Sequence, residues 1–129
     1  MKYLLDTQVF LWSFLHPKKI PGKVWALVED PDRELYLSAA SAWEIAIKVR
    51  LGKLEIPADP GLYVSRRTRE SNISSLSITQ EHALAAGGLP LHHRDPFDRM
   101  LVAQAQLENL TLVTADEEFA KYGVRCLTI

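Results

Sequence analysis

The chain alternates short apolar segments with stretches of helical periodicity along its whole length, and this alternation limits the folds open to it. We predict strands over residues 2–5, 34–37, 73–76, 111–114 and 124–129. We predict helices or helical turns over residues 9–15, 23–29, 38–51, 59–72, 79–87, 95–109 and 117–122. Strands that alternate with helices favour a three-layer α/β sandwich with a mainly parallel sheet.

Length and composition narrow the class of protein further. The 129 residues suit one domain, so we expect residues 1–129 to share one core. No apolar run approaches the ~20 residues that a membrane span needs, and Asp6 comes too early for a secretory signal. The single cysteine, Cys126, excludes an internal disulfide and a multi-cysteine metal site. These features fit a cytoplasmic protein without a membrane span.

One helix start carries two acidic residues. Asp95-Pro96 predicts the beginning of a helix, because Asp is a preferred N-cap residue and Pro fits the first helical position. Asp98 then lies in the first turn, where the helix dipole favours a negative charge. The simplest interpretation is that Asp95 caps the helix and Asp98 complements the dipole. The positions of the other acids favour a functional interpretation.

Four acidic residues fall where they can reach one edge of the predicted sheet. Asp6 follows the first strand, Asp116 follows the fourth, and Asp98 opens the helix that leads into that fourth strand. Glu44 lies in the first or second turn of the helix after the second strand. Ligands of parallel α/β folds bind at the carboxyl ends of the strands. We therefore expect these four acids to share one cleft.

A cluster of carboxylates needs a cation, because like charges a few ångströms apart repel one another. Oxygen ligands without cysteine or an obvious histidine set point to a hard ion, Mg²⁺ or Mn²⁺. One such ion, or a pair ~4 Å apart, can activate water and stabilise the charge on a transferring phosphate. The natural chemistry of such a site is metal-assisted hydrolysis of a phosphodiester bond.

Each acid also has a simpler structural interpretation. Asp6 and Asp116 could be helix N-caps. Ser41-Ala42-Trp43-Glu44 matches a capping box, and Glu44 and Lys48 are spaced as a surface ion pair. These interpretations are reasonable one by one, but they do not explain why all four acids would reach one edge.

The sequence resembles the PIN-domain ribonucleases, and most closely the VapC-type toxins of bacterial toxin–antitoxin pairs. The segments that carry the resemblance are Leu4-Leu5-Asp6-Thr7, Leu37-Ser38-Ala39-Ala40-Ser41-Ala42-Trp43-Glu44-Ile45, Asp95-Pro96-Phe97-Asp98-Arg99-Met100-Leu101-Val102-Ala103-Gln104-Ala105 and Leu112-Val113-Thr114-Ala115-Asp116. They span almost the whole chain in the family's order. The resemblance implies magnesium-dependent, sequence- or structure-selective cleavage of RNA by a homodimer that a cognate antitoxin inhibits by covering the cleft.

The resemblance also implies roles for individual residues. Asp6, Asp98 and Asp116 correspond to the family's metal ligands, and Glu44 to its fourth catalytic carboxylate. Asp95 is then the helix cap or a group that supports a ligand. Thr7 and Thr114 offer hydroxyls beside the acids, which could hold the ligands in orientation.

An RNA substrate requires cations, and the net charge of −1 means that they must form a local patch. Arg99 is the strongest candidate for a phosphate contact, because it follows Asp98, although it could simply pair with an acid. The other candidates are Lys48, Arg50, Lys53 and Arg94, whereas Arg66, Arg67 and Arg69 fit a solvated surface. His92 and His93 could contact phosphate, but histidines in loops are more often simply exposed. We expect Trp12, Trp25 and Trp43 to pack in the core or at a dimer or antitoxin groove.

Two other kinds of protein remain as alternatives. A receiver-like signalling domain has a similar size and a site at the strand ends, but it needs paired acids after the first strand and an Asp after a middle strand. Here Asp6 stands alone, and no Asp follows residues 73–76. A phosphatase with an Asp-x-Asp motif does not remain an alternative, because Gln8 occupies the second acid position. An inactive binding module with a PIN fold is the second alternative, although all four acids are present.

Overall fold

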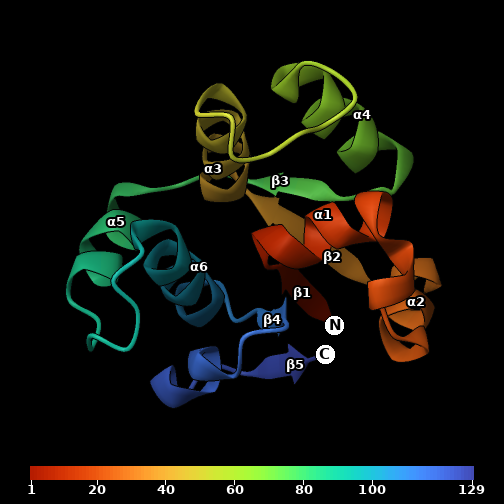
Figure 1. The fold of residues 1–129 in the computed structure, drawn as a ribbon. Helices are drawn as coiled ribbons and strands as arrows, with labels where there is room; N and C mark the ends of the chain where they lie inside the picture. The colour runs from red at the N-terminus through yellow and green to blue at the C-terminus, as the bar shows by residue number, and fades with distance from the viewer.

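The computed structural model describes residues 1–129 and contains a five-stranded sheet. The strands are β1 (Lys2–Leu5), β2 (Glu34–Ser38), β3 (Ser74–Leu76), β4 (Thr111–Thr114) and β5 (Cys126–Thr128). The helices are α1 (Thr7–Leu15), α2 (Gly22–Glu29), α3 (Ala39–Arg50), α4 (Pro60–Glu70), α5 (Gln80–Gly87) and α6 (Pro96–Leu107). Two 3-10 turns, η1 (Pro17–Lys19) and η2 (Glu117–Tyr122), complete the chain (Figure 1).

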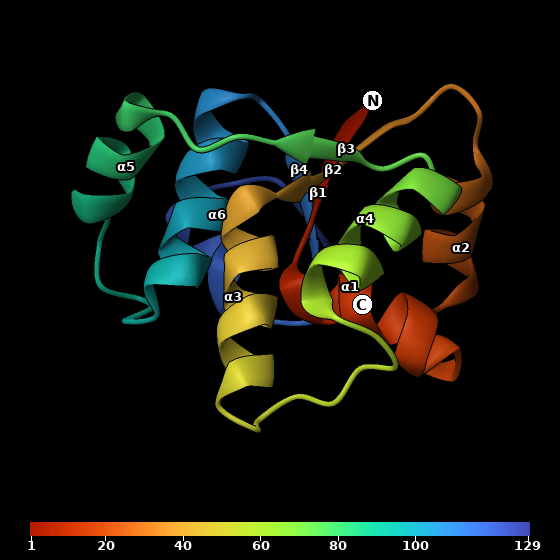
Figure 2. The ribbon, with the colours of Figure 1, turned by 90° about the horizontal axis from the view of Figure 1, so that it is seen from above.

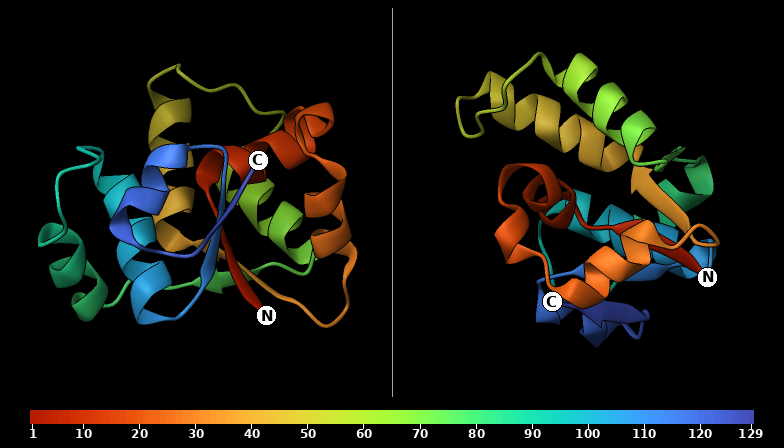
Figure 3. Two further views of the ribbon diagram at one scale, coloured as in Figure 1. Left: turned by 90° about the horizontal axis from the view of Figure 1, so that it is seen from below. Right: turned by 90° about the vertical axis from the view of Figure 1, so that its right-hand side faces the viewer.

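Every pairing in the sheet is parallel, and the strand order is β3-β2-β1-β4-β5. The predicted three-layer α/β sandwich with a mainly parallel sheet is therefore confirmed. Figure 3 shows the C-terminal η2 and β5 (blue) on the opposite side of the molecule from α3 and α4. A receiver-like domain has the order 2-1-3-4-5, so this topology argues against that alternative.

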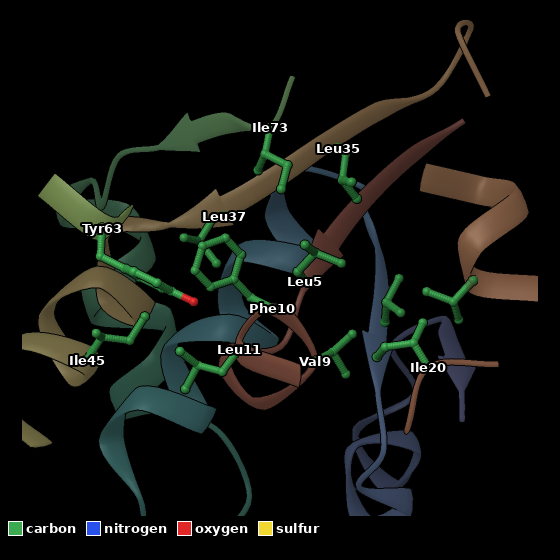
Figure 4. Close-up of a cluster of buried hydrophobic side chains, with 12 residues drawn as sticks. Leu5, Val9, Phe10, Leu11, Ile20, Leu35, Leu37, Ile45, Tyr63 and Ile73 are labelled. Atoms are coloured by element: carbon green, nitrogen blue, oxygen red, sulfur yellow. The ribbon is translucent and has the colours of Figure 1, made fainter. Parts of the chain in front are cut away.

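Alternation along the strands divides the core into two layers, because successive side chains of a strand point to opposite faces. Leu5, Leu35 and Val113 face the layer of α1, α2 and α4, where Phe10 and Tyr63 complete the packing (Figure 4). The neighbouring strand residues Leu4 and Leu112 face α6 and η2. They pack against these buried side chains of that layer: Leu101, Val102, Ala105 and Phe119. Both faces of the sheet are thus covered by helices.

Helix α3 stands between α6 and α4, as the view from above shows (Figure 2). Its N-cap is Ser38, whose hydroxyl accepts a hydrogen bond from the Ala40 amide. The capping box that the sequence suggested at Ser41 and Glu44 is therefore wrong. Ser41 lies inside the helix and accepts a hydrogen bond from the Thr7 hydroxyl at 2.7 Å, which ties α3 to α1.

The strand order places a topological switch point between β1 and β4. The chain leaves β1 toward β2 and β3 on one side, and it reaches β4 and β5 on the other. Loops that follow β1 and β4 consequently diverge, and a crevice opens outside their carboxyl ends. Asp6 follows β1 and Asp116 follows β4 after one residue, so both acids lie at this crevice.

Candidate active site

A pocket of about 330 Å³ opens at the ends of β1 and β4. Its lining includes every acid that the sequence analysis selected, and these acids come from four separate segments: Asp6, Glu44, Asp95, Asp98 and Asp116. The structure thus brings together acids that are up to 110 positions apart in the sequence. Only two of the ten residues that line the pocket are hydrophobic, as suits a site for a charged ligand.

Asp6 occupies the N-cap position of α1, yet its side chain makes no capping hydrogen bond. One carboxylate oxygen, Oδ2, accepts a hydrogen bond of 2.7 Å from the Thr114 hydroxyl. The same Thr114 oxygen accepts one of 3.0 Å from the Asp116 amide. Thr114 therefore links Asp6 and Asp116 through hydrogen bonds, and its hydroxyl lies beside these acids as expected from the sequence. The Thr7 hydroxyl differs, because it contacts Ser41 and no carboxylate.

The pKa of Asp6 is raised above its ordinary value, mainly because the side chain is buried. The hydrogen bond from Thr114 opposes this effect, whereas the charges of Glu44 and Asp116 add to it. The charges of Glu44 and Asp116 raise the pKa of Asp6 because these carboxylates lie close to it in the pocket.

Asp98 lies in the first turn of α6, and Asp95 caps the same helix by accepting hydrogen bonds from the Phe97 and Asp98 amides. Burial and the charges of Asp95, Asp6 and Glu44 raise the pKa of Asp98 to about 7. The charge of His93 opposes this increase. Desolvation and repulsion from the neighbouring carboxylates therefore dominate at Asp98.

Glu44 is buried on the face of α3 that meets the pocket, and its Oε2 atom lies 2.6 Å from Nζ of Lys48. This hydrogen bond raises the pKa of Lys48 above its ordinary value. The expected ion pair exists, but it differs from a common surface pair because only the lysine is substantially exposed. It places one ammonium group at the rim of an otherwise acidic pocket.

Asp116 caps η2 by accepting a hydrogen bond of 2.9 Å from the Glu118 amide. Its other oxygen, Oδ2, is 2.8 Å from Nε2 of His93. Burial alone would raise the pKa of Asp116, but the hydrogen bonds from His93 and Glu118 hold the pKa below its ordinary value. Asp116 therefore stays ionised more easily than Asp6 and Asp98.

Sequence reasoning missed His93. The side chain was expected to be exposed, but it is only 9% exposed and its ring stacks with those of Phe119 and Tyr122. The residue lies two positions before Asp95, and no local pattern marks it. Its partner is 23 positions away, so only the fold brings the pair together.

Arg99 does not face the pocket, contrary to our expectation of a phosphate contact. It is 9% exposed, and its two terminal nitrogens donate to main-chain carbonyl oxygens of the preceding loop. These acceptors belong to Gly87, Leu89, Pro90 and His93. The N–H donors of a planar guanidinium have fixed directions, and those of Arg99 hold the loop that carries His93 and Asp95.

Trp43 does not pack in the core, because it is 62% exposed and meets Phe97 edge-to-face at 5.3 Å; the other expected location, a dimer or antitoxin groove, stays a prediction. Trp12 and Trp25 are partly buried against the core, as expected. Arg67 lies over the rings of Phe14 and Tyr63, which fits a structural role for that arginine.

The pocket offers the donors that a hard cation prefers, because every acidic side chain in its lining presents carboxylate oxygens. The raised pKa values of Asp6 and Asp98 reflect repulsion that a bound cation would relieve. The side chains do not form a finished cage, because no group of three or more His, Cys, Asp or Glu side chains is arranged to hold an ion as it stands. The residues fit a divalent cation in the chemistry of their donors, and Asp6, Asp98 and Asp116 would hold it.

The chain is similar to several known proteins. It is 49% identical over 57 residues to Ribonuclease VapC16 of Mycobacterium tuberculosis, and this match covers 44% of the chain and 40% of that relative. Among solved structures, VapBC2 from Rickettsia felis, bound to a DNA fragment from its promoter, matches with a TM-score of 0.73 and 16% identity. That match covers 99% of this chain and 98% of the other.

A toxin–antitoxin complex from Klebsiella pneumoniae matches with a TM-score of 0.61 and 20% identity, over 92% of this chain and 90% of the other. These structural likenesses establish the fold. No helix of the structure is both long and apolar enough to cross a membrane. The family model described as PIN domain matches residues 3–124, which is nearly the whole sequence. The chain therefore belongs to the PIN domain family.

Proposed function

We propose that the protein is a divalent-metal-dependent endoribonuclease, the toxin of a toxin–antitoxin pair, which hydrolyses phosphodiester bonds of RNA. The observation that carries this proposal is the convergence of five carboxylates from four segments in one polar pocket at the β1/β4 switch point. The name of the relative Ribonuclease VapC16 supports RNA as the substrate.

Asp6, Asp98 and Asp116 are the residues that would hold Mg²⁺ or Mn²⁺. A cation held there supplies Lewis-acid activation of a water molecule and stabilises the charge on the transferring phosphoryl group. Thr114 and His93 hold Asp6 and Asp116 in place through their hydrogen bonds. Lys48 neutralises part of the charge of Glu44 and leaves an ammonium group at the rim, where a phosphate approaches.

The partner in this proposal is an antitoxin protein, because one of the solved structures with this fold is a toxin–antitoxin complex. The homodimer that the resemblance to VapC-type toxins implies is part of the same proposal. Growth arrest on expression, relieved when the product of the adjacent small gene is expressed as well, tests the assignment as a toxin. Normal growth with abundant folded protein would contradict it.

The test of the chemistry compares cleavage of RNA in Mg²⁺ by the wild type, Asp6→Asn and Asp98→Asn. We expect both variants to lose at least about 99% of the activity while they stay folded, because each removes a cation ligand. The matched control is Glu81→Gln, which changes an exposed first-turn acid of α5 outside the pocket. Full activity of both aspartate variants, or undiminished cleavage in excess EDTA, would contradict the proposal.

The same experiment separates the enzyme from an inactive binding module with a PIN fold. The module would bind RNA or a protein but would cleave nothing, with or without Mg²⁺. Mapping the RNA ends that the wild type produces would then define the cleavage site.

A further inference from the structure

A second hollow, of about 220 Å³, adjoins the carboxylate pocket. The two share Gln8, Leu11 and Lys48, so one groove continues from the acids over α1 and the end of α3. The new part of the groove is bordered by Lys19, from η1, and by Lys53, which follows α3. The groove thus changes from acidic to basic along its length.

The charges in this second hollow are of one sign. Three ammonium groups line it, those of Lys19, Lys48 and Lys53, and no acidic side chain does. The ammonium group of Lys48 is paired with Glu44, whereas those of Lys19 and Lys53 form no ion pair. Lys19 and Lys53 thus bring two ammonium groups without an anionic partner to the same hollow, where like charges repel one another. A negatively charged ligand would relieve this repulsion.

The wall of the hollow is apolar between these cations. Nζ of Lys19 lies 4.9 Å from the centre of the Trp12 ring, and Leu15 and Leu54 lie alongside. A nucleic-acid strand presents this combination of chemistry, because its phosphates are anionic and its sugars and bases offer apolar faces. A compact anion such as free phosphate would use the lysines but not the wall.

We propose that the hollow is a subsite for the RNA strand, and that Lys19, Lys48 and Lys53 contact phosphates next to the one that is cleaved. This inference rests on the proposed function. The carboxylate pocket by itself repels a polyanion, and the net charge of −1 supplies no general attraction. The lysine subsite provides the local attraction that brings RNA across the acidic end of the same groove.

The test measures binding of a fluorescein-labelled single-stranded RNA by anisotropy in EDTA, which prevents cleavage, from about 50 to about 200 mM salt. The variant is Lys19→Gln/Lys53→Gln, and the matched control is Lys18→Gln, an exposed neighbour in η1 that lies outside the hollow. We expect the double variant to bind more weakly and to lose about 1.4 from the slope of log K against log salt, because each phosphate contact contributes about 0.7 on single strands. Thermal melting confirms that each variant is folded.

In Mg²⁺ the double variant is also expected to raise KM more than it lowers kcat, since neither lysine touches the carboxylates. The subsite is overturned if the wild type binds and cleaves RNA while the double variant has the same salt slope as Lys18→Gln. It is also overturned if the double variant loses binding of an acidic peptide but keeps its RNA affinity, because the lysines then serve a protein partner. If the wild type neither binds nor cleaves RNA, the proposed function fails, and the subsite fails with it.

Discussion

Nε2 of His93 donates a hydrogen bond of 2.8 Å to Oδ2 of Asp116. The Tyr122 hydroxyl accepts a hydrogen bond of 2.7 Å from the His93 main-chain N–H and lies 3.0 Å from Nδ1 of the same ring. Tyr122 thereby fixes His93, and His93 fixes the carboxylate.

We therefore predict that His93→Ala weakens Mn²⁺ binding about 10- to 100-fold, the effect usual for a group that orients a metal ligand. His93→Gln should restore part of the affinity, because its amide can donate to Asp116. Tyr122→Phe keeps a stacked ring but removes the hydroxyl, and it should fall between these two. Calorimetric titration of Mn²⁺ measures the affinities, and His92→Gln is the control. Equal affinity in His93→Ala and wild type would contradict the prediction.

The sequence alone predicted the order of strands and helices along the chain and the convergence of the acids in one cleft. Strand-end residues such as Asp6 and Asp116 meet because parallel strands end at one edge, which is a property of the fold class. His93 and Arg99 could not be predicted, because their partners are defined by loop geometry and include main-chain carbonyls. The sequence left two locations open for Trp43, the core or a groove for a partner, because helical spacing alone does not tell whether an apolar side chain on a helix is covered; the structure shows it exposed.

The buried guanidinium of Arg99 predicts an effect on stability. Arg99→Met leaves the loop carbonyls without their charged donor, so we expect the free energy of unfolding to fall by about 2–4 kcal/mol and Tm by roughly 10 °C. Arg94→Gln changes an exposed arginine of the same loop and should stay within about 0.5 kcal/mol of wild type. Urea unfolding measures both. A near-neutral effect of Arg99→Met would show that the loop does not depend on these bonds.

Divalent cations should stabilise the folded protein, because they bind the carboxylate group of the folded state and relieve its repulsion. At a concentration of about 100 times Kd, the added stability is about 2.7 kcal/mol. We expect Mg²⁺ to raise the Tm of the wild type and to have little effect on Asp98→Asn. Differential scanning calorimetry with and without EDTA measures the shift. The same Mg²⁺ response in both proteins would place the ion elsewhere.

The raised pKa of Asp98 predicts how stability changes with pH when no metal is present. The pKa is about 7 in the folded protein and about 3.9 in an unfolded chain, so between these values the folded state binds more protons. Stability from this group is therefore fully present below about pH 4 and is lost as the pH rises to 7.

Asp98→Asn removes this loss, because asparagine does not ionise. In EDTA the variant should gain a few degrees in Tm over wild type at pH 8 and gain less at pH 5, since partial exposure of the carboxylate reduces the effect. Comparing the two proteins at each pH cancels the titration of the other groups to first order. An equal difference in Tm at both pH values would show that the charge on Asp98 costs the fold nothing.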